Sequence, residues 1–318
     1  MEQRQISAEL SFDGTADEIW AQLKKDDADT TRTVARNFAD ARVSFSLGAD
    51  KPLDSLSEKE WEKAAVSFGL ALGPGKDLIE ARAVGDSLYV RGDIKGLIEK
   101  TGADTQRDDL ALLDQMTDAV DELPDALGSI KDALHGKWIE FDPKDFEEFS
   151  AEQFTEEGDN SLFPGAVLGE FSAKDKQKAL EAIGKALGKN VDIKADGEKN
   201  GVERFTLTLP ARDTAADLLK GLKPLEDKLG LSEVNAKDFA DRDVRITIAV
   251  KDGMVNKLSF DPGRLDPNSE AALPVTLSLK AGGSPVKAPT DAKKLNPQDI
   301  FGAFAYTAMQ NGEWQNAR

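Results

Sequence analysis

The chain contains few residues of the types that carry most enzymatic chemistry. It has no cysteine and a single histidine, His135. Without cysteine there are no disulfides, no thiolate nucleophiles and no cysteine-based zinc sites. A histidine acting as a general base would need a nucleophile and an orienting acid near it, and the neighbouring sequence offers neither. We therefore interpret His135 as the C-terminal residue of a helix, where the helix dipole favours positive charge.

Acidic residues are abundant, but their spacing identifies no site. With 59 aspartates and glutamates, close carboxylate pairs of the glycoside hydrolase type are unavoidable in any fold. Asp26, Asp27 and Asp29 lack the spacing and the closing glutamate of a calcium-binding EF-hand loop, so we interpret them as a solvated loop. Residues 91–93 form an Arg-Gly-Asp tripeptide, which we interpret as a strand end followed by a helix cap. No glycine-rich phosphate loop is present. We expect no enzyme, no cofactor and no metal.

The composition excludes further classes of function. The 318 residues include 41 lysines and arginines, so the formal net charge is −18. Such a chain repels nucleic acid and has little tendency to dock on anionic membranes through a basic face. No apolar run approaches the roughly 20 residues that span a bilayer, and the polar first ten residues do not form a signal peptide. The lack of cysteine favours an extracytoplasmic protein, and a cytoplasmic one is the alternative.

Alternation of apolar and polar residues predicts about ten antiparallel strands. The pattern begins at Ile6 and recurs around residues 43–47, 66–72, 79–92, 139–141, 192–210, 244–260 and 275–279. Asp252-Gly253 is typical of a two-residue hairpin turn, and Gly85-Asp86 predicts a second tight hairpin. In 192–210, two strands are expected around a loop of Asp, Gly and Asn.

Helical periodicity lies between these groups of strands. Thr15 and Glu18 predict a capping box for a first helix. Further helices are expected over 106–134 with an interruption near Pro124, over 172–188 with an end at Gly188, from Asp213 with a break at Pro224, and from Asn296-Pro297 onward. The fold class is therefore α+β: a curved antiparallel half-barrel sheet with helices packed on its concave face. We expect a single large domain, 1–318, and the alternative is two similar halves, 1–150 and 166–318, joined by loop 150–165.

The order of these segments resembles actinobacterial cell-envelope lipoproteins with the LolA/LppX/LprG-type fold. The resemblance rests on DLIEARAVGDSLYVRGD followed by GKWIEFD, on GVERFTLTLP, on ITIAVKDGMVNKLSFD and on LPVTLSLKAGGSPVKAPTDAKKL. It covers about two-thirds of the chain and includes no catalytic signature. It implies an open half-barrel that carries lipids or lipoproteins between the membrane and the outer envelope, without a cofactor. The chain is longer than a typical member and lacks the acylated cysteine, which fits a sequence that begins after that cysteine.

Two functions of different classes remain open. The first is a non-enzymatic extracytoplasmic lipoprotein that binds a lipid, an acyl chain or another apolar ligand between sheet and helices, with a membrane anchor outside this sequence. The alternative is a cell-surface interaction or sensor module with a filled core and no ligand. An enzyme is a third and weaker hypothesis. For the first hypothesis, the expected cavity residues are Phe45, Leu47, Phe68, Leu70, Leu88, Val90, Leu113, Met116, Phe205, Leu207, Ile246 and Ile248.

Overall fold

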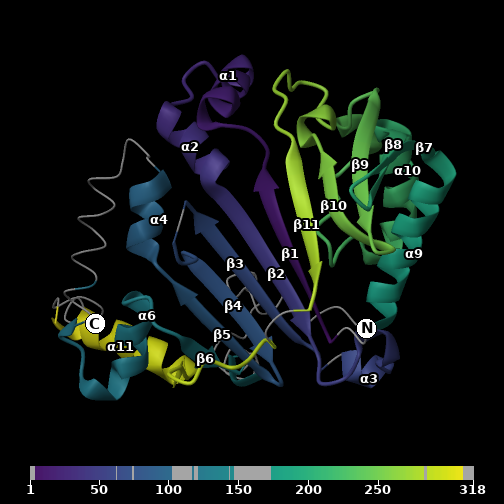
Figure 1. The fold of residues 1–318 in the computed structure, drawn as a ribbon. Helices are drawn as coiled ribbons and strands as arrows, with labels where there is room; N and C mark the ends of the chain where they lie inside the picture. The colour runs from purple at the N-terminus through teal and green to yellow at the C-terminus, as the bar shows by residue number, and fades with distance from the viewer. Residues whose placement is uncertain are drawn as a thin grey trace.

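One large open sheet dominates the computed structural model of the chain (Figure 1). The structure describes residues 4–61, 63–73, 75–101, 117, 121–142, 144–146, 173–282 and 285–310. The described part forms a twelve-stranded sheet in the order β12-β6-β5-β4-β3-β2-β1-β11-β10-β9-β8-β7. Neighbouring strands are antiparallel except β12 and β6, which are parallel. The sheet does not close, so the predicted α+β class with an open, mostly antiparallel sheet is confirmed.

The strands are short, and tight turns join β4 to β5, β7 to β8 and β9 to β10. Their bounds are β1 Gln5–Phe12, β2 Ala41–Gly48, β3 Ala65–Leu72, β4 Ile79–Val84, β5 Ser87–Gly92, β6 Ile139–Phe141, β7 Asp192–Lys199, β8 Val202–Pro210, β9 Asp243–Lys251, β10 Met254–Phe260, β11 Val275–Ala281 and β12 Lys293–Lys294. The α-helices are α1 Ala16–Asp26, α2 Arg32–Asp40, α3 Glu58–Trp61, α4 Ile94–Thr101, α6 Gly128–Leu134, α9 Ala173–Asn190, α10 Ala211–Leu222 and α11 Pro297–Gln310.

The hairpin turns follow from residues that tolerate a positive φ. Asp252 and Gly253 have φ of 53° and 75° between β9 and β10, which fits a type I′ turn and confirms the prediction. Gly85 has φ of 63° in the confirmed turn between β4 and β5. The β7–β8 turn is formed by Asn200 and Gly201 alone, with φ of 55° and 73°. The Asp-Gly pair at 196–197, which was expected in the loop, instead lies in β7 beside a break in its register with β8.

The helix boundaries agree with the capping signals in part. The capping box of Thr15 and Glu18 is present at α1, and the helix break at Pro224 is confirmed because α10 ends at Leu222. Two boundaries were wrong. Helix α9 continues past Gly188 to Asn190, whose amide donates to the Ala186 carbonyl, and α10 begins at residue 211, before Asp213. Most of the helix expected over 106–134 and the loop expected over 150–165 lie outside the described residues.

The pairing register divides the sheet into an apolar and a polar face, because directly opposed residues project to the same side. On β1, Ile6, Leu10 and their alternating neighbours lie on the apolar face, and Ser7 and Glu9 lie on the polar face. The same division continues through every neighbouring strand pair. The two faces therefore differ in chemistry over the whole width of the sheet.

An irregular segment, residues 285–292, connects the two halves of the sheet across the polar face. It follows β11 in the middle of the sheet and leads to β12 at one edge. The guanidinium of Arg82, on β4, donates to the Lys287 carbonyl at 3.1 Å, and the backbone of Val286 lies close to Gly48 of β2. We call residues 285–292 the crossing segment.

Candidate functional site

The apolar face contains an unbroken row of large hydrophobic side chains across eight strands. From β8 to β4, consecutive register partners are Phe205, Ile248, Leu258, Leu277, Leu10, Val43, Leu70 and Ile79. With strands about 4.8 Å apart, this row is about 34 Å long. Half of a bilayer's hydrocarbon core is about 15 Å thick, which is the depth that one acyl chain fills. The row is therefore longer than such a chain.

The middle of this face is left partly open to solvent. Phe45 on β2 and Phe68 on β3 are register partners, and they remain 45% and 40% exposed. Ile6 on β1 is 38% exposed. Small residues flank the aromatic pair, because Ala8 of β1 is the partner of Phe45 and Ala81 of β4 is the partner of Phe68. The result is a shallow apolar surface with two rings standing between small neighbours.

Helices pack on the apolar face at two places. The Phe38 ring of α2 packs edge-on against Phe12 of β1, near the centre of the strand order, with ring centres 5.0 Å apart. Toward the β7 edge, Leu187 of α9 packs on a buried cluster that includes Leu209 and Val244. In Figure 1, α1 and α2 lie above the central strands, and α9 and α10 lie beside the β7 edge of the sheet. The exposed aromatic pair lies on β2 and β3, on the other side of β1 from the strands that α9 contacts.

Ten of the twelve expected cavity residues lie on this apolar face. The register places the pairs on β2, β3, β5, β8 and β9 on the same side of the sheet. They differ in exposure: Leu88 is buried, whereas Phe45 and Phe68 are exposed. Leu113 and Met116 lie outside the described residues. The alternation therefore identified the face, while the exposed central pair depends on where the helices pack and has no local signal in the sequence.

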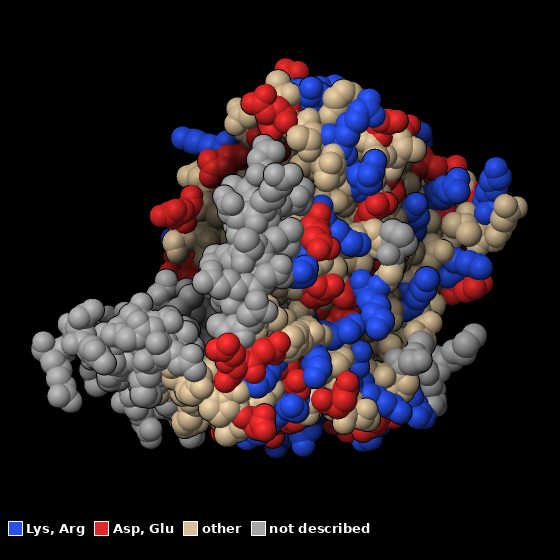
Figure 2. Space-filling view, turned by 90° about the vertical axis from the view of Figure 1, so that its left-hand side faces the viewer, with Lys and Arg blue, Asp and Glu red and all other residues tan. Residues whose placement is uncertain are grey.

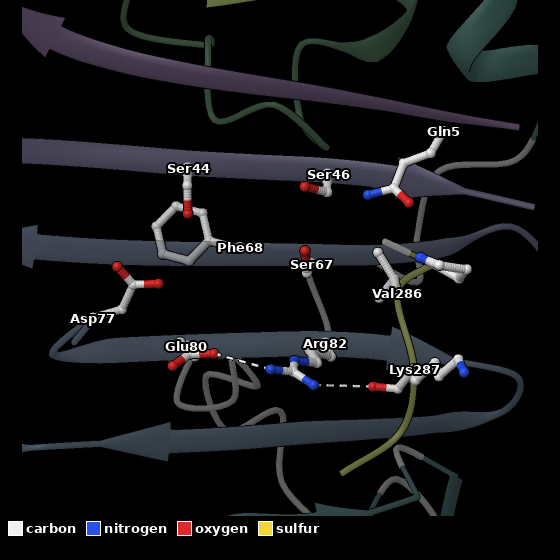
Figure 3. Close-up of a pocket in the computed structure, with 11 residues that line it drawn as sticks. Gln5, Ser44, Ser46, Ser67, Phe68, Asp77, Glu80, Arg82, Val286 and Lys287 are labelled. Atoms are coloured by element: carbon white, nitrogen blue, oxygen red, sulfur yellow. Dashed lines mark hydrogen bonds and ion pairs between the residues drawn. The ribbon is translucent and has the colours of Figure 1, made fainter. Parts of the chain in front are cut away.

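A polar pocket of about 310 Å³ lies on the opposite face (Figure 3). Its floor is formed by β1 to β4 and its rim includes the crossing segment. The lining residues are Gln5, Ser44, Ser46, Ser67, Phe68, Asp77, Glu80, Arg82, Pro285, Val286 and Lys287. No local pattern in the sequence marks this pocket, because residues 285–287 lie about 200 to 280 positions from the strand residues that line it.

An ion-pair network forms one side of this pocket. The Glu80 carboxylate accepts from Arg91 Nε at 2.8 Å and from Arg82 Nη2 at 3.2 Å. Both guanidinium groups also lie over the buried Trp138 ring, 5.3 and 4.6 Å from its centre. Asp77 lies in the loop between β3 and β4, and its pKa is raised, first by burial and then by the nearby Glu80 charge.

The short motifs have structural roles. Arg91 pairs with Glu80, and the Asp93 carboxylate accepts from the Gly96 amide at the start of α4, so the Arg-Gly-Asp tripeptide is a strand end and helix cap, as expected. His135 is the residue that ends α6, and its Nε2 lies 2.8 Å from Asp121 Oδ1. Asp26 accepts from Ser269 Oγ and from two backbone amides, which connects α1 to the segment before β11.

The described residues show little sign of other chemistry. None of their helices is long and apolar enough to cross a bilayer, and no cluster of three or more potential metal ligands occurs among them. Figure 2 shows basic and acidic side chains interspersed on one side of the molecule. The described residues visible on that side therefore form no extended region of a single charge.

Comparisons with known protein families, with curated proteins and with solved structures found no match for this chain.

Proposed function

We propose that the protein is a non-enzymatic, extracytoplasmic lipid-binding protein, similar in role to the LolA/LppX/LprG-type lipoproteins, that holds an acyl chain or another apolar ligand against the apolar face of its sheet. The observation that carries the proposal is the partly exposed pair Phe45 and Phe68 on β2 and β3, within an apolar face that spans eight strands. Large contiguous apolar surfaces on soluble proteins commonly mark binding sites.

The arrangement of the face favours an elongated apolar ligand. The row from Phe205 to Ile79 crosses the strands; helices contact its face at β8–β9 and at β1, and the rings beside it on β2 and β3 are partly exposed. An acyl chain lying along this row would cover the exposed rings and remove their apolar surface from water. The small side chains of Ala8 and Ala81 leave space beside the rings.

Lipid binding is tested with protein purified without detergent. Native mass spectrometry should show a co-purifying lipid, and delipidation should lower the melting temperature, because a ligand that binds only the folded state stabilises it by mass action. A fluorescent fatty acid should bind the delipidated protein, and Phe68→Asp should weaken this binding, because a charge in an apolar contact is costly.

The matched control is Phe301→Asp, which places the same charge at a 62% exposed phenylalanine of α11. It should leave fatty-acid binding unchanged. If the delipidated protein binds no fatty acid, the lipid-binding proposal is wrong, and a pull-down in which Phe68→Asp releases a protein partner would support the interaction-module alternative.

A further inference from the structure

The polar pocket beneath the crossing segment contains hydrogen-bonding groups that have no partner in the described chain. Gln5 is only 7% exposed, and its Oε1 is buried without a hydrogen bond from any described residue. An unpaired buried acceptor is costly to folding. Figure 3 shows the Gln5 amide among the pocket residues, on the same side as Ser46 and Val286.

A second acceptor lies at the other end of the pocket. No hydrogen bond or ion pair within the described part of the chain reaches the Asp77 carboxylate. Its Oδ2 and the Ser44 hydroxyl both lie over Gly69 of β3, at 2.5 and 2.6 Å from the position that a Cβ would occupy. Only the missing side chain of Gly69 leaves the two groups room to lie side by side on the pocket floor.

The remaining lining is polar and close to neutral overall. Among the lining residues, the cations Arg82 and Lys287 are offset by Glu80 and Asp77, and Arg91, which lies outside the lining, also pairs with Glu80. The hydroxyls of Ser44, Ser46 and Ser67 lie between Gln5 and Asp77 on adjacent strands and can each donate or accept. Ser46 Oγ already shares one hydrogen bond with Ser7 Oγ, at 3.0 Å. The pocket therefore offers many hydrogen bonds and little net charge.

We propose that this pocket binds a small, neutral, polyhydroxylated ligand of monosaccharide size. A carboxylate and an amide oxygen accept from neighbouring hydroxyl groups, and serine hydroxyls complete the set with donors. The volume of about 310 Å³ lies at the lower end of the range for ligand sites. Phe68 contributes to both, but the other lining residues on the strands lie on the opposite face of the sheet from the proposed lipid surface.

The test uses D-glucose, D-galactose, D-mannose and myo-inositol as probes, in ligand-observed NMR and calorimetry on the full chain. At least one probe should bind, and Asp77→Asn should weaken it tenfold or more by removing the charged acceptor. Gly69→Ala should weaken it similarly, because the added methyl group displaces the Asp77 and Ser44 side chains. Asp192→Asn, on the exposed strand β7, is the matched control and should bind as the original chain does.

Three outcomes would overturn the proposal. The first is that no probe binds with a Kd below about 10 mM. The second is that Asp77→Asn, shown by circular dichroism to be folded, binds the probe as tightly as the original chain does. The third is binding of an organic cation such as ethylammonium in place of every polyol. Fatty-acid binding by Asp77→Asn separates the two sites, because it should be unchanged even if the polyol site is wrong.

Discussion

Removing the exposed aromatic pair should weaken acyl-chain binding by an amount that the structure bounds. A phenylalanine presents roughly 200 Å² of surface, so the exposed 45% of Phe45 and 40% of Phe68 correspond to about 80–90 Å² each. At about 25 cal/mol per Å², covering one ring with ligand contributes about 2 kcal/mol, a factor of about 30 in Kd. Phe45→Thr or Phe68→Thr should therefore weaken fatty-acid binding by up to about 30-fold, and threonine keeps a high strand propensity.

The assay is titration of a fluorescent fatty acid into delipidated protein, with urea denaturation of each variant beside it. The already buried part of each ring is about 115 Å², so each substitution costs about 3 kcal/mol of stability from lost burial, and any cavity left behind adds to this cost. Phe301→Thr, at a 62% exposed position of α11, is the control for a general loss of surface aromatics. If both sheet variants are folded and bind fatty acid as tightly as the original chain, the ligand does not lie on the Phe45–Phe68 surface and the reasoning fails.

Three further predictions concern stability. Gly253→Val should lower the free energy of unfolding by more than about 1 kcal/mol in urea denaturation, because φ at this position is 75° and a β-branched residue resists it. Asp77→Asn should raise the melting temperature at neutral pH, because burial and the nearby Glu80 charge raise the pKa of Asp77 and its charged form therefore destabilises the fold. Below that pKa the carboxyl is neutral, so the gain in melting temperature should vanish on acidification. A gain that persists at acidic pH would contradict this explanation. Hydrogen bonds from Lys137 and Lys293 lower the pKa of Asp132. The Asp132 carboxylate therefore contributes its full stabilisation of the fold above its ordinary pKa of 3.8, and this stabilisation is lost as the pH falls through the lowered pKa. Lys293→Ala should accordingly show a weaker dependence of the free energy of unfolding on pH across this range, measured by denaturation.

The sheet could be predicted from the sequence because its pattern is local. Alternation identifies each strand and its apolar side, and a pair such as Asp252-Gly253 specifies a two-residue turn and hence a register. Helix α2 was missed because it is only nine residues long, so the helical spacing of Val34, Ala35 and Phe38 spans little more than one turn; its support comes from packing, as in the contact of Phe38 with Phe12. Strand β12 was missed because two residues, Lys293–Lys294, show no alternation and pair in parallel with a distant strand.

The polar pocket could not be predicted from the sequence, because no single segment of the chain contains a pattern that indicates it. Glycine within a strand normally weakens it, and Gly69 is explained only by Asp77, a loop residue that folds back over the strand. Gln5 opens β1 in alternation with apolar residues, which predicts a solvent-facing side chain, yet it is 7% exposed under a segment nearly three hundred residues away. A sequence rule that assigns polar strand residues to water is therefore wrong wherever a later segment crosses the polar face. The crossing segment leaves the oxygen of Gln5 buried and without a partner among the described residues. This unpaired acceptor is the reason to expect a ligand there rather than on the remainder of the polar face.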